Sequence, residues 1–367
     1  MPLLVIVSLI WLLLPLWWWP SRVRQALAVP DIQQAFLDLW RATRGPFWLY
    51  ALGLGGLGMA MGKGVWATAP PLVVDALSVF GGAVLVLMGS ALTGILQAPF
   101  TTRWLDRRVT WPEAALRSAT RLLMLVGPMA VYLWVTLALG PQWVAGHLAL
   151  WIAVSIAGGI VMEALSPWAA RLMLRTTWPD EALSARWDVL RRRAGIGRVS
   201  FVLWPGRRDR VANAFATGLY RPLIAVSDYL VDRLPPAELD AVIGHELGHV
   251  KHRHAWGGLM GIVGGVVLVT SFVILPRAWV IGLFALAVPW TIWWLSYWQR
   301  RAEFSADAFY DRVGVSPATT AQALATLGTL TPFPPTLPRS VELTMSHPSL
   351  AHRIERLTRA AQAETTD

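Results

Sequence analysis

The sequence contains no cysteine and few charged residues. Of its 367 residues 15% are charged, and its only lysines are Lys63 and Lys251. Without cysteine the chain forms neither disulfides nor thiolate–metal bonds, so a metal site must use histidine and carboxylate ligands. The low charge also argues against two or three soluble domains, which the length alone would allow.

Apolar residues make up 55% of the chain, and 22 residues are tryptophan. This is more apolar surface than a soluble core of this size normally buries, so the composition predicts a membrane protein. The net charge is +10, and the arginines cluster beside apolar stretches. That distribution is typical of the positive-inside rule and not of a groove for phosphates. We therefore expect a lipid bilayer as partner, and no nucleic acid.

Seven apolar stretches predict membrane-spanning helices, each of which needs about 20 residues. They are residues 3–19, 46–62, 71–100, 122–140, 143–166, 257–275 and 278–298. The loops after the first, third, fifth and seventh stretches are rich in arginine, whereas the others carry at most one charge. This alternation predicts an N-terminus outside and a cytoplasmic polar segment. Arg22 and Arg24 follow the first stretch, so we interpret it as an uncleaved span and not as a signal peptide.

The excess of arginine over lysine suggests a bacterial protein, hence an inner-membrane location. The polar segment is expected to hold a helix over residues 180–193 and three short strands, over residues 199–204, 211–217 and 222–227. The predicted fold is thus mainly α and multi-pass, with a small β-sheet. Its expected parts are a five-span membrane region, a first catalytic part, two further spans and a second catalytic part, over residues 1–166, 167–256, 257–298 and 299–367.

The motif His245-Glu246-Leu247-Gly248-His249 lies near the end of the polar segment. On a helix, residues four apart share one face, so His245 and His249 can present two imidazoles to a single metal ion. Imidazole pairs with an open catalytic position are typical of zinc. Glu246 is then placed to take a proton from the attacking water as general base. The alternative is a pair of structural histidines beside a surface glutamate.

A catalytic zinc normally takes a third protein ligand. His252 and His254 follow the motif closely, and we interpret them as cations at the membrane interface. His147 lies in the fifth apolar stretch, near its outer end, and is a weaker candidate.

Glu303 and Asp307 are the best remaining candidates, because their i,i+4 spacing puts both carboxylates on one helix face. One carboxylate can bind the metal while the other accepts a hydrogen bond from a metal-bound histidine. The alternative is a solvated helix face, with Arg300 and Arg301 as partners.

His-Glu-Leu-Gly-His with a later Glu-Phe-Ser-Ala-Asp resembles the membrane zinc metalloproteases that include HtpX and the type I CAAX prenyl endopeptidases. Further similar stretches are residues 213–218, 234–250, 346–348 and 353–354. The similarity covers most of residues 167–357 except the two spans. The order of spans and catalytic parts is similar to that of the CAAX endopeptidases, although the loops are compact and no endoplasmic-reticulum retrieval signal is evident.

The resemblance implies a gluzincin-like zinc protease domain with one zinc ion. It implies that Glu303 is the third ligand and that Asp307 accepts a hydrogen bond from a metal-bound histidine without binding the metal itself. It also implies a substrate-binding edge strand with residues Asn213, Ala214, Phe215 and Ala216. His347 would lie near the site and donate to the oxyanion, and Arg353 would tie the terminal helix to the site carboxylates.

The sequence thus predicts an integral membrane zinc endopeptidase that cleaves membrane-associated, lipidated or misfolded proteins at the cytoplasmic face. One alternative is a zinc-protease-type sensor that relays an outside signal, which the short outer loops disfavour. Another is a catalytically idle membrane interaction protein, which the complete set of reactive groups disfavours. We also expect the motif helix to run unbroken from His245 to Trp256, about 16 Å, so that zinc lies against the inner membrane face.

Overall fold

The computed structural model describes residues 2–65, 70–342, 345 and 347–364. Within these residues the chain is mainly helical, as predicted, with one three-stranded sheet. Ser346 of the predicted stretch 346–348 lies outside the described residues. The chain divides into two compact units: unit 1 comprises Met1–Leu148 and Val269–Leu275, and unit 2 comprises Ala149–Leu268 and Pro276–Asp367.

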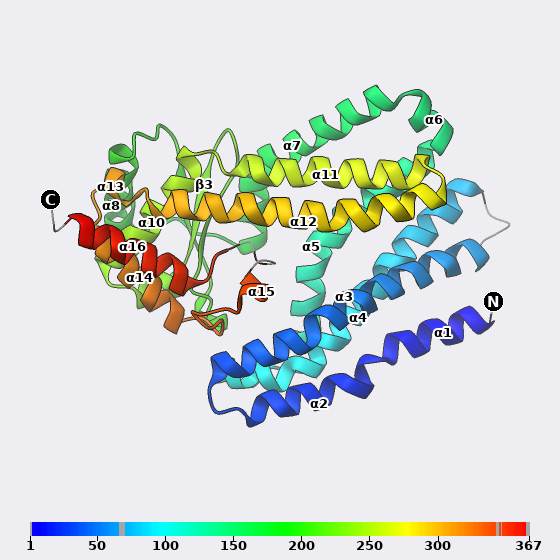
Figure 1. Cartoon of the computed structure of the whole chain (residues 1–367), viewed down its shortest axis with the longest axis horizontal. Helices are drawn as coiled ribbons and strands as arrows, with labels where there is room; N and C mark the ends of the chain where they lie inside the picture. The colour runs from blue at the N-terminus through cyan, green and yellow to red at the C-terminus, as the bar shows by residue number, and fades with distance from the viewer. Residues whose placement is uncertain (1, 66–69, 343–344, 346, 365–367) are drawn as a thin grey trace. The chain divides into compact units, whose positions relative to one another are not determined.

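Unit 1 is built mostly from the helices of the N-terminal part of the chain, coloured blue to green in Figure 1. They are α1 (Pro2–Leu13), α2 (Pro15–Ala28), α3 (Ile32–Val65), α4 (Pro71–Leu105), α5 (Trp111–Leu139) and α6 (Pro141–Gly146). Small residues bring α4 and α5 together: Ser90 Oγ lies 2.9 Å from Ser118 Oγ. A Cβ on Gly94 would lie 2.5 Å from the Ala114 carbonyl oxygen. Close approach through small residues is typical of helices that pack in lipid.

Three helical segments of the described chain are long and apolar enough to cross a membrane: Ile6–Ala28, Val73–Leu105 and Leu148–Leu174. Shorter apolar helical segments are Ala130–Leu139 and Ala255–Leu268. All seven predicted stretches fall on helices almost throughout. The membrane character of the fold therefore agrees with the sequence, and the number of spans stays a prediction.

Unit 2 contains the sheet, the motif helix and the C-terminal helices. Its elements before the motif are α7 (Leu148–Leu174), α8 (Glu181–Arg193), β1 (Ser200–Trp204), the 3-10 turn η1 (Arg207–Asp209), β2 (Ala214–Thr217), β3 (Leu223–Ser227) and α9 (Asp228–Arg233). Next come α10 (Pro236–Lys251), α11 (Ala255–Ile274), α12 (Arg277–Asp307), α13 (Tyr310–Val313), α14 (Pro317–Thr329), α15 (Arg339–Glu342) and α16 (Leu350–Glu364). The residues of α11 that belong to unit 2 lie beside α12, where a Cβ on Gly261 would contact Leu295 (Figure 1).

The sheet has the order β1-β3-β2. The apolar run of β3 is buried at every position, because β3 lies between its two neighbours. β1 pairs with it in parallel, with Ser200 opposite Leu223. β2 pairs with it antiparallel, with Ala214 opposite Val226, and forms one edge of the sheet. This edge borders the functional site.

The helix α10 lies in the main core of unit 2, packed against β2, α8, α12 and α14. Its apolar face is buried together with side chains of the sheet and of the flanking helices, among them Trp187, Ile224, Leu230, Ile243, Leu247 and Val313. Burying a side chain of this size stabilises the fold by about 1.5–3 kcal/mol. The motif residues therefore stand on a rigid element.

The predicted unbroken helix from His245 to Trp256 is wrong, because α10 ends at Lys251 and α11 begins at Ala255. Arg253 adopts the left-handed conformation, with φ of 54°. Its N–H donates to the Val250 carbonyl, and the His254 N–H donates to the His249 carbonyl. These two bonds form a Schellman motif, whose left-handed residue is usually glycine. Arginine at this position hid the helix end from the sequence pattern.

Candidate metal centre

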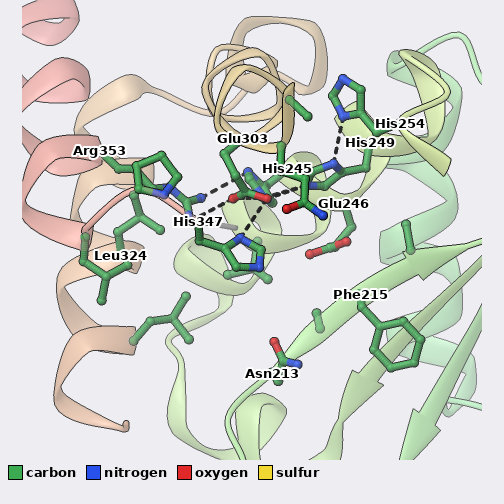
Figure 2. Close-up of a pocket in the computed structure, with 18 of the residues that line it drawn as sticks. Asn213, Phe215, His245, Glu246, His249, His254, Glu303, Leu324, His347 and Arg353 are labelled. Atoms are coloured by element: carbon green, nitrogen blue, oxygen red, sulfur yellow. Dashed lines mark hydrogen bonds and ion pairs between the residues drawn. The ribbon is translucent and has the colours of Figure 1, made fainter. Parts of the chain in front are cut away.

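Two helices bring together the three residues predicted to bind metal. His245 and His249 lie one turn apart on α10, and their Nε2 atoms are 3.0 Å apart. Glu303 on α12 places Oε2 3.6 Å from His245 Nε2 and Oε1 3.4 Å from His249 Nε2 (Figure 2). Glu303 is 4% exposed, so its carboxylate is turned away from solvent and toward the two imidazoles.

Glycines of the motif helix let the second ligand helix come this close. A Cβ on Gly248 would lie 3.0 Å from both the Ala306 Cα and the Phe309 Cβ. A Cβ on Gly244 would lie 2.7 Å from Val313 Cγ2. The two glycines thus allow α12 and the turn after it to lie directly against α10. This contact brings Glu303 within reach of the imidazoles.

The donor set fits a tetrahedral zinc ion. Zinc binds imidazole nitrogen and carboxylate oxygen at about 2.0–2.2 Å, which puts tetrahedral donors about 3.4 Å apart. The separations of 3.0, 3.4 and 3.6 Å among His245, His249 and Glu303 agree with this geometry. The three residues thus form a group able to hold a metal ion. Three protein ligands leave a fourth position free, as catalytic sites require.

Asp307 lies behind His245 on the same helix as Glu303. His245 Nδ1 is 2.9 Å from Asp307 Oδ1. That contact makes Nδ1 the protonated nitrogen and leaves Nε2 free to bind metal. Burial alone would raise the pKa of Asp307, but the charge of Arg353 and the hydrogen bond from His245 lower it to about 2. Asp307 is therefore a charged acceptor at neutral pH.

Arg353 comes from the C-terminal helix α16 and is buried among the carboxylates. Its Nη1 is 3.1 Å from Glu303 Oε2, and it also binds Asp307. Burial would raise the pKa of Glu303, but hydrogen bonds from His249 and His347 and the nearby charges hold that pKa far below its usual range. The site thus keeps Glu303 ionised, as a metal ligand must be. Arg353 thus joins the C-terminal helix α16 to both carboxylates of α12.

Glu246 and the edge strand line one cavity of about 810 Å³ with the three ligands. Glu246 is 6% exposed, and Figure 2 shows its side chain between the ligand cluster and the strand that carries Phe215. The predicted edge residues Asn213, Ala214, Phe215 and Ala216 all line this cavity. Asn213 lies just before β2, which is shorter than the predicted strand. The cavity also extends along apolar side chains of α14, among them Leu324.

His347 reaches the ligand cluster from the segment before α16. Its Nδ1 is 2.9 Å from Glu303 Oε1, and its side chain is 67% exposed. The nearby Glu342 accepts a hydrogen bond from the Ser349 N–H at 2.8 Å, which ties this segment down. His347 is therefore at the cavity wall beside the ligands. Its role toward an oxyanion stays a prediction.

His254 lies directly behind the ligand His249, a position that the sequence did not indicate. Its Nδ1 is 2.8 Å from His249 Nδ1, and its Nε2 is 3.2 Å from Ser305 Oγ. Burial and the neighbouring His249 lower the pKa of His254 to about 4, so it is neutral at physiological pH. The interpretation of His254 as an interfacial cation did not include this contact with the predicted ligand His249. The sequence pattern did not indicate the turn at Arg253. In a continuous helix the His254 side chain would not point toward His249.

The part of the chain that contains this site is similar to known peptidases. The model of Peptidase family M48 matches residues 178–361. The chain is 36% identical over 117 residues to Protease HtpX of Stutzerimonas stutzeri, covering 29% of this chain and 39% of that protein. It is 54% identical over 48 residues to Protease HtpX homolog 2 of Methanosarcina mazei, covering 12% of this chain and 16% of that protein. The aligned parts thus span less than half of these relatives.

A solved structure extends the likeness to the fold. The crystal structure of S. mikatae Ste24p superposes with a TM-score of 0.60 at 16% identity. The match covers 92% of this chain and 89% of that chain. Thus the fold likeness includes the N-terminal helices, which lie outside the part matched by the family model.

Proposed function

The chain belongs to peptidase family M48, and on that premise we propose that it is an integral membrane endopeptidase that uses one zinc ion. The observation that carries the proposal is the convergence of two Nε2 atoms and one buried carboxylate beside a further buried carboxylate, Glu246. Two imidazoles, a carboxylate ligand and a glutamate base are the donor set of zinc peptidases with the H-E-x-x-H motif.

In this proposal His245, His249 and Glu303 hold the metal, and Asp307 and Arg353 fix the orientation of His245. When bound, zinc supplies a Lewis acid that polarises the scissile carbonyl and makes water a better nucleophile. Glu246 takes the proton of the attacking water and passes it to the leaving amine, because it lies in the cavity next to the ligands. His347 donates a hydrogen bond to the oxyanion that forms on the carbonyl.

The substrate backbone adds to the free edge of β2 as a further strand. β2 borders β3 on one side only, and its residues line the cavity that contains the ligands. Strand addition binds an extended peptide through its main chain, so it tolerates many side chains. This supports a peptidase with broad sequence tolerance.

Membrane-associated proteins, including lipidated or misfolded ones, are the proposed substrates. Ala255 and Gln299 line the cavity close to the apolar parts of α11 and α12. At the end of β2, Thr217 Oγ1 lies 2.7 Å from Ser166 Oγ of the apolar helix α7. The cavity therefore adjoins three apolar helices. With the arginine-rich loops of the sequence, this supports a site at the cytoplasmic face of a bacterial inner membrane.

A cleavage assay in proteoliposomes tests the proposal. We expect the purified full-length protein to bind one zinc and to cleave an unfolded membrane-anchored polypeptide. Glu246→Gln should abolish cleavage and leave zinc bound, because it removes the base and no ligand. His249→Ala should lose both zinc and cleavage. Full cleavage by the Glu246→Gln variant, or by protein stripped of metal, would contradict the assigned roles.

A further inference from the structure

The imidazole of His254 continues the metal site behind His249. His249 turns Nε2 toward His245 and Glu303, so its Nδ1 is the nitrogen that must carry the proton when Nε2 binds metal. A protonated Nδ1 needs an acceptor. The nearest partner that the structure gives it is His254 Nδ1, at 2.8 Å.

The hydrogen bonds around His254 have one consistent direction. If Nδ1 of His254 accepts from His249, the His254 proton is on Nε2, which lies 3.2 Å from Ser305 Oγ. Ser305 Oγ is free to accept there, because its own proton goes to the Ala302 carbonyl at 2.9 Å. The chain of donors thus runs from α10 to α12. It ends on the residue before the ligand Glu303.

We propose that His254 is a positioning residue that accepts the Nδ1–H of His249 and thereby fixes the tautomer and ring orientation of this metal ligand. The inference rests on the zinc site proposed above. His254 then does for His249 what Asp307 does for His245, with a neutral acceptor in place of a carboxylate. Each imidazole ligand has its own partner behind it.

The helix break after α10 builds this arrangement. Arg253 takes the left-handed conformation, and the His254 N–H bonds back to the His249 carbonyl. The chain therefore reverses direction at the end of α10, and the His254 side chain lies against the imidazole ring of His249. The left-handed conformation is unfavourable for a residue other than glycine, because its Cβ comes close to the following carbonyl oxygen. The backbone keeps this conformation although a straight helix would avoid the strain.

Two substitutions of His254 distinguish its role as a hydrogen-bond acceptor from its role in packing. In H254N the side-chain amide oxygen would take the position of His254 Nδ1, whereas the leucine of H254L has a similar branched shape and no acceptor. We therefore compare H254N with H254L in the full-length protein. H252L is the control for lost packing, since His252 is exposed and its ring packs on both Phe309 and His254. The readouts are zinc affinity, by competition with a chelator, and the visible spectrum of the cobalt(II)-substituted protein, which reports ligand geometry.

We expect H254L to weaken zinc binding about 10–100-fold and to shift the cobalt spectrum, as loss of a partner behind a ligand does. H254N should keep both close to wild type, and H252L should change neither. Equal zinc affinity and spectra in H254L and wild type would overturn the inference and leave the proposed function intact. Equal losses in H254L and H254N would also overturn it. A wild-type protein that binds no cobalt would overturn the proposed function as well.

Discussion

Arg353 binds Asp307 with two hydrogen bonds, from Nε to Oδ2 at 2.8 Å and from Nη2 to Oδ1 at 2.6 Å. The same Asp307 Oδ1 faces His245 Nδ1. The C-terminal helix α16 is thereby linked to a ligand on α10 through one carboxylate. Arginine is suited to this position, because its planar fork matches both oxygens of a carboxylate.

Replacing Arg353 with lysine should loosen this link. Lysine keeps the charge but cannot bind both oxygens in the plane of the carboxylate. We expect Arg353→Lys to lower zinc affinity about tenfold, at the mild end of losses seen for groups behind metal ligands. Arg359→Lys on the same helix is the control, because Arg359 is exposed and pairs with Glu355. Zinc affinity unchanged in Arg353→Lys would contradict the positioning role.

Glu303 and His347 lie 2.9 Å apart, and their substitutions should have different effects. Glu303→Ala removes a ligand, so we expect the zinc content of the purified protein to fall strongly. His347→Ala should leave zinc bound and slow cleavage about 10²–10³-fold, the loss typical of an oxyanion donor. Zinc content and single-turnover cleavage rates distinguish the two. If His347→Ala stripped zinc and Glu303→Ala did not, the ligand set would be wrong.

Gly248→Ala should damage the site through the backbone of α12. The added Cβ would lie 3.0 Å from the Ala306 Cα and would push α12, with Glu303, away from α10. Alanine favours a helix interior over glycine by about 1 kcal/mol, so a loss of zinc affinity cannot come from weaker helix formation. Gly257→Ala is the control, since its Cβ would meet nothing within 4 Å. Equal zinc affinity in both variants would count against this contact.

Ala216→Pro should remove one main-chain donor from the free edge of β2. Asn213 accepts from the Ser227 N–H of β3 at 2.9 Å. Because antiparallel strands alternate, Ala214 and Ala216 direct their N–H groups to the open edge. Proline is tolerated at such positions. Losing one hydrogen bond to substrate should lower kcat/KM about five- to tenfold, at the upper end for such a bond.

Ala216→Ser keeps the N–H and is the control for Ala216→Pro. Zinc content should be the same in both variants, which shows that the metal site is intact. Cleavage by Ala216→Pro at the wild-type rate would exclude strand addition at this edge.

Local spacing made much of the site predictable. His245 and His249 share a helix face by their i,i+4 spacing, and Glu303 and Asp307 share another for the same reason. What spacing could not give is the contact between the two helices, which depends on Gly248 lying against Ala306. The resemblance to a known family supplied that pairing at the sequence level.

The helix break after α10 could not be predicted, because arginine seldom takes the left-handed position that ends a helix. The error in the expected continuous helix and the missed role of His254 have this one cause. β2 was expected from Val211 but begins at Ala214. Asn213, just before β2, is held differently, since its N–H donates to the side-chain hydroxyl of Ser227 and not to a main-chain carbonyl of β3.

Because of the helix break after α10, the three metal ligands differ in how they are connected to the apolar helices. α12 runs without interruption from Arg277 to Asp307, so Glu303 lies on the same continuous helix as the apolar residues before it. The two histidines stand on α10, which the turn at Arg253 separates from the apolar helix α11. A movement of α12 would therefore be transmitted directly to one ligand of three, whereas a movement of α11 would reach the two imidazoles only through the turn at Arg253.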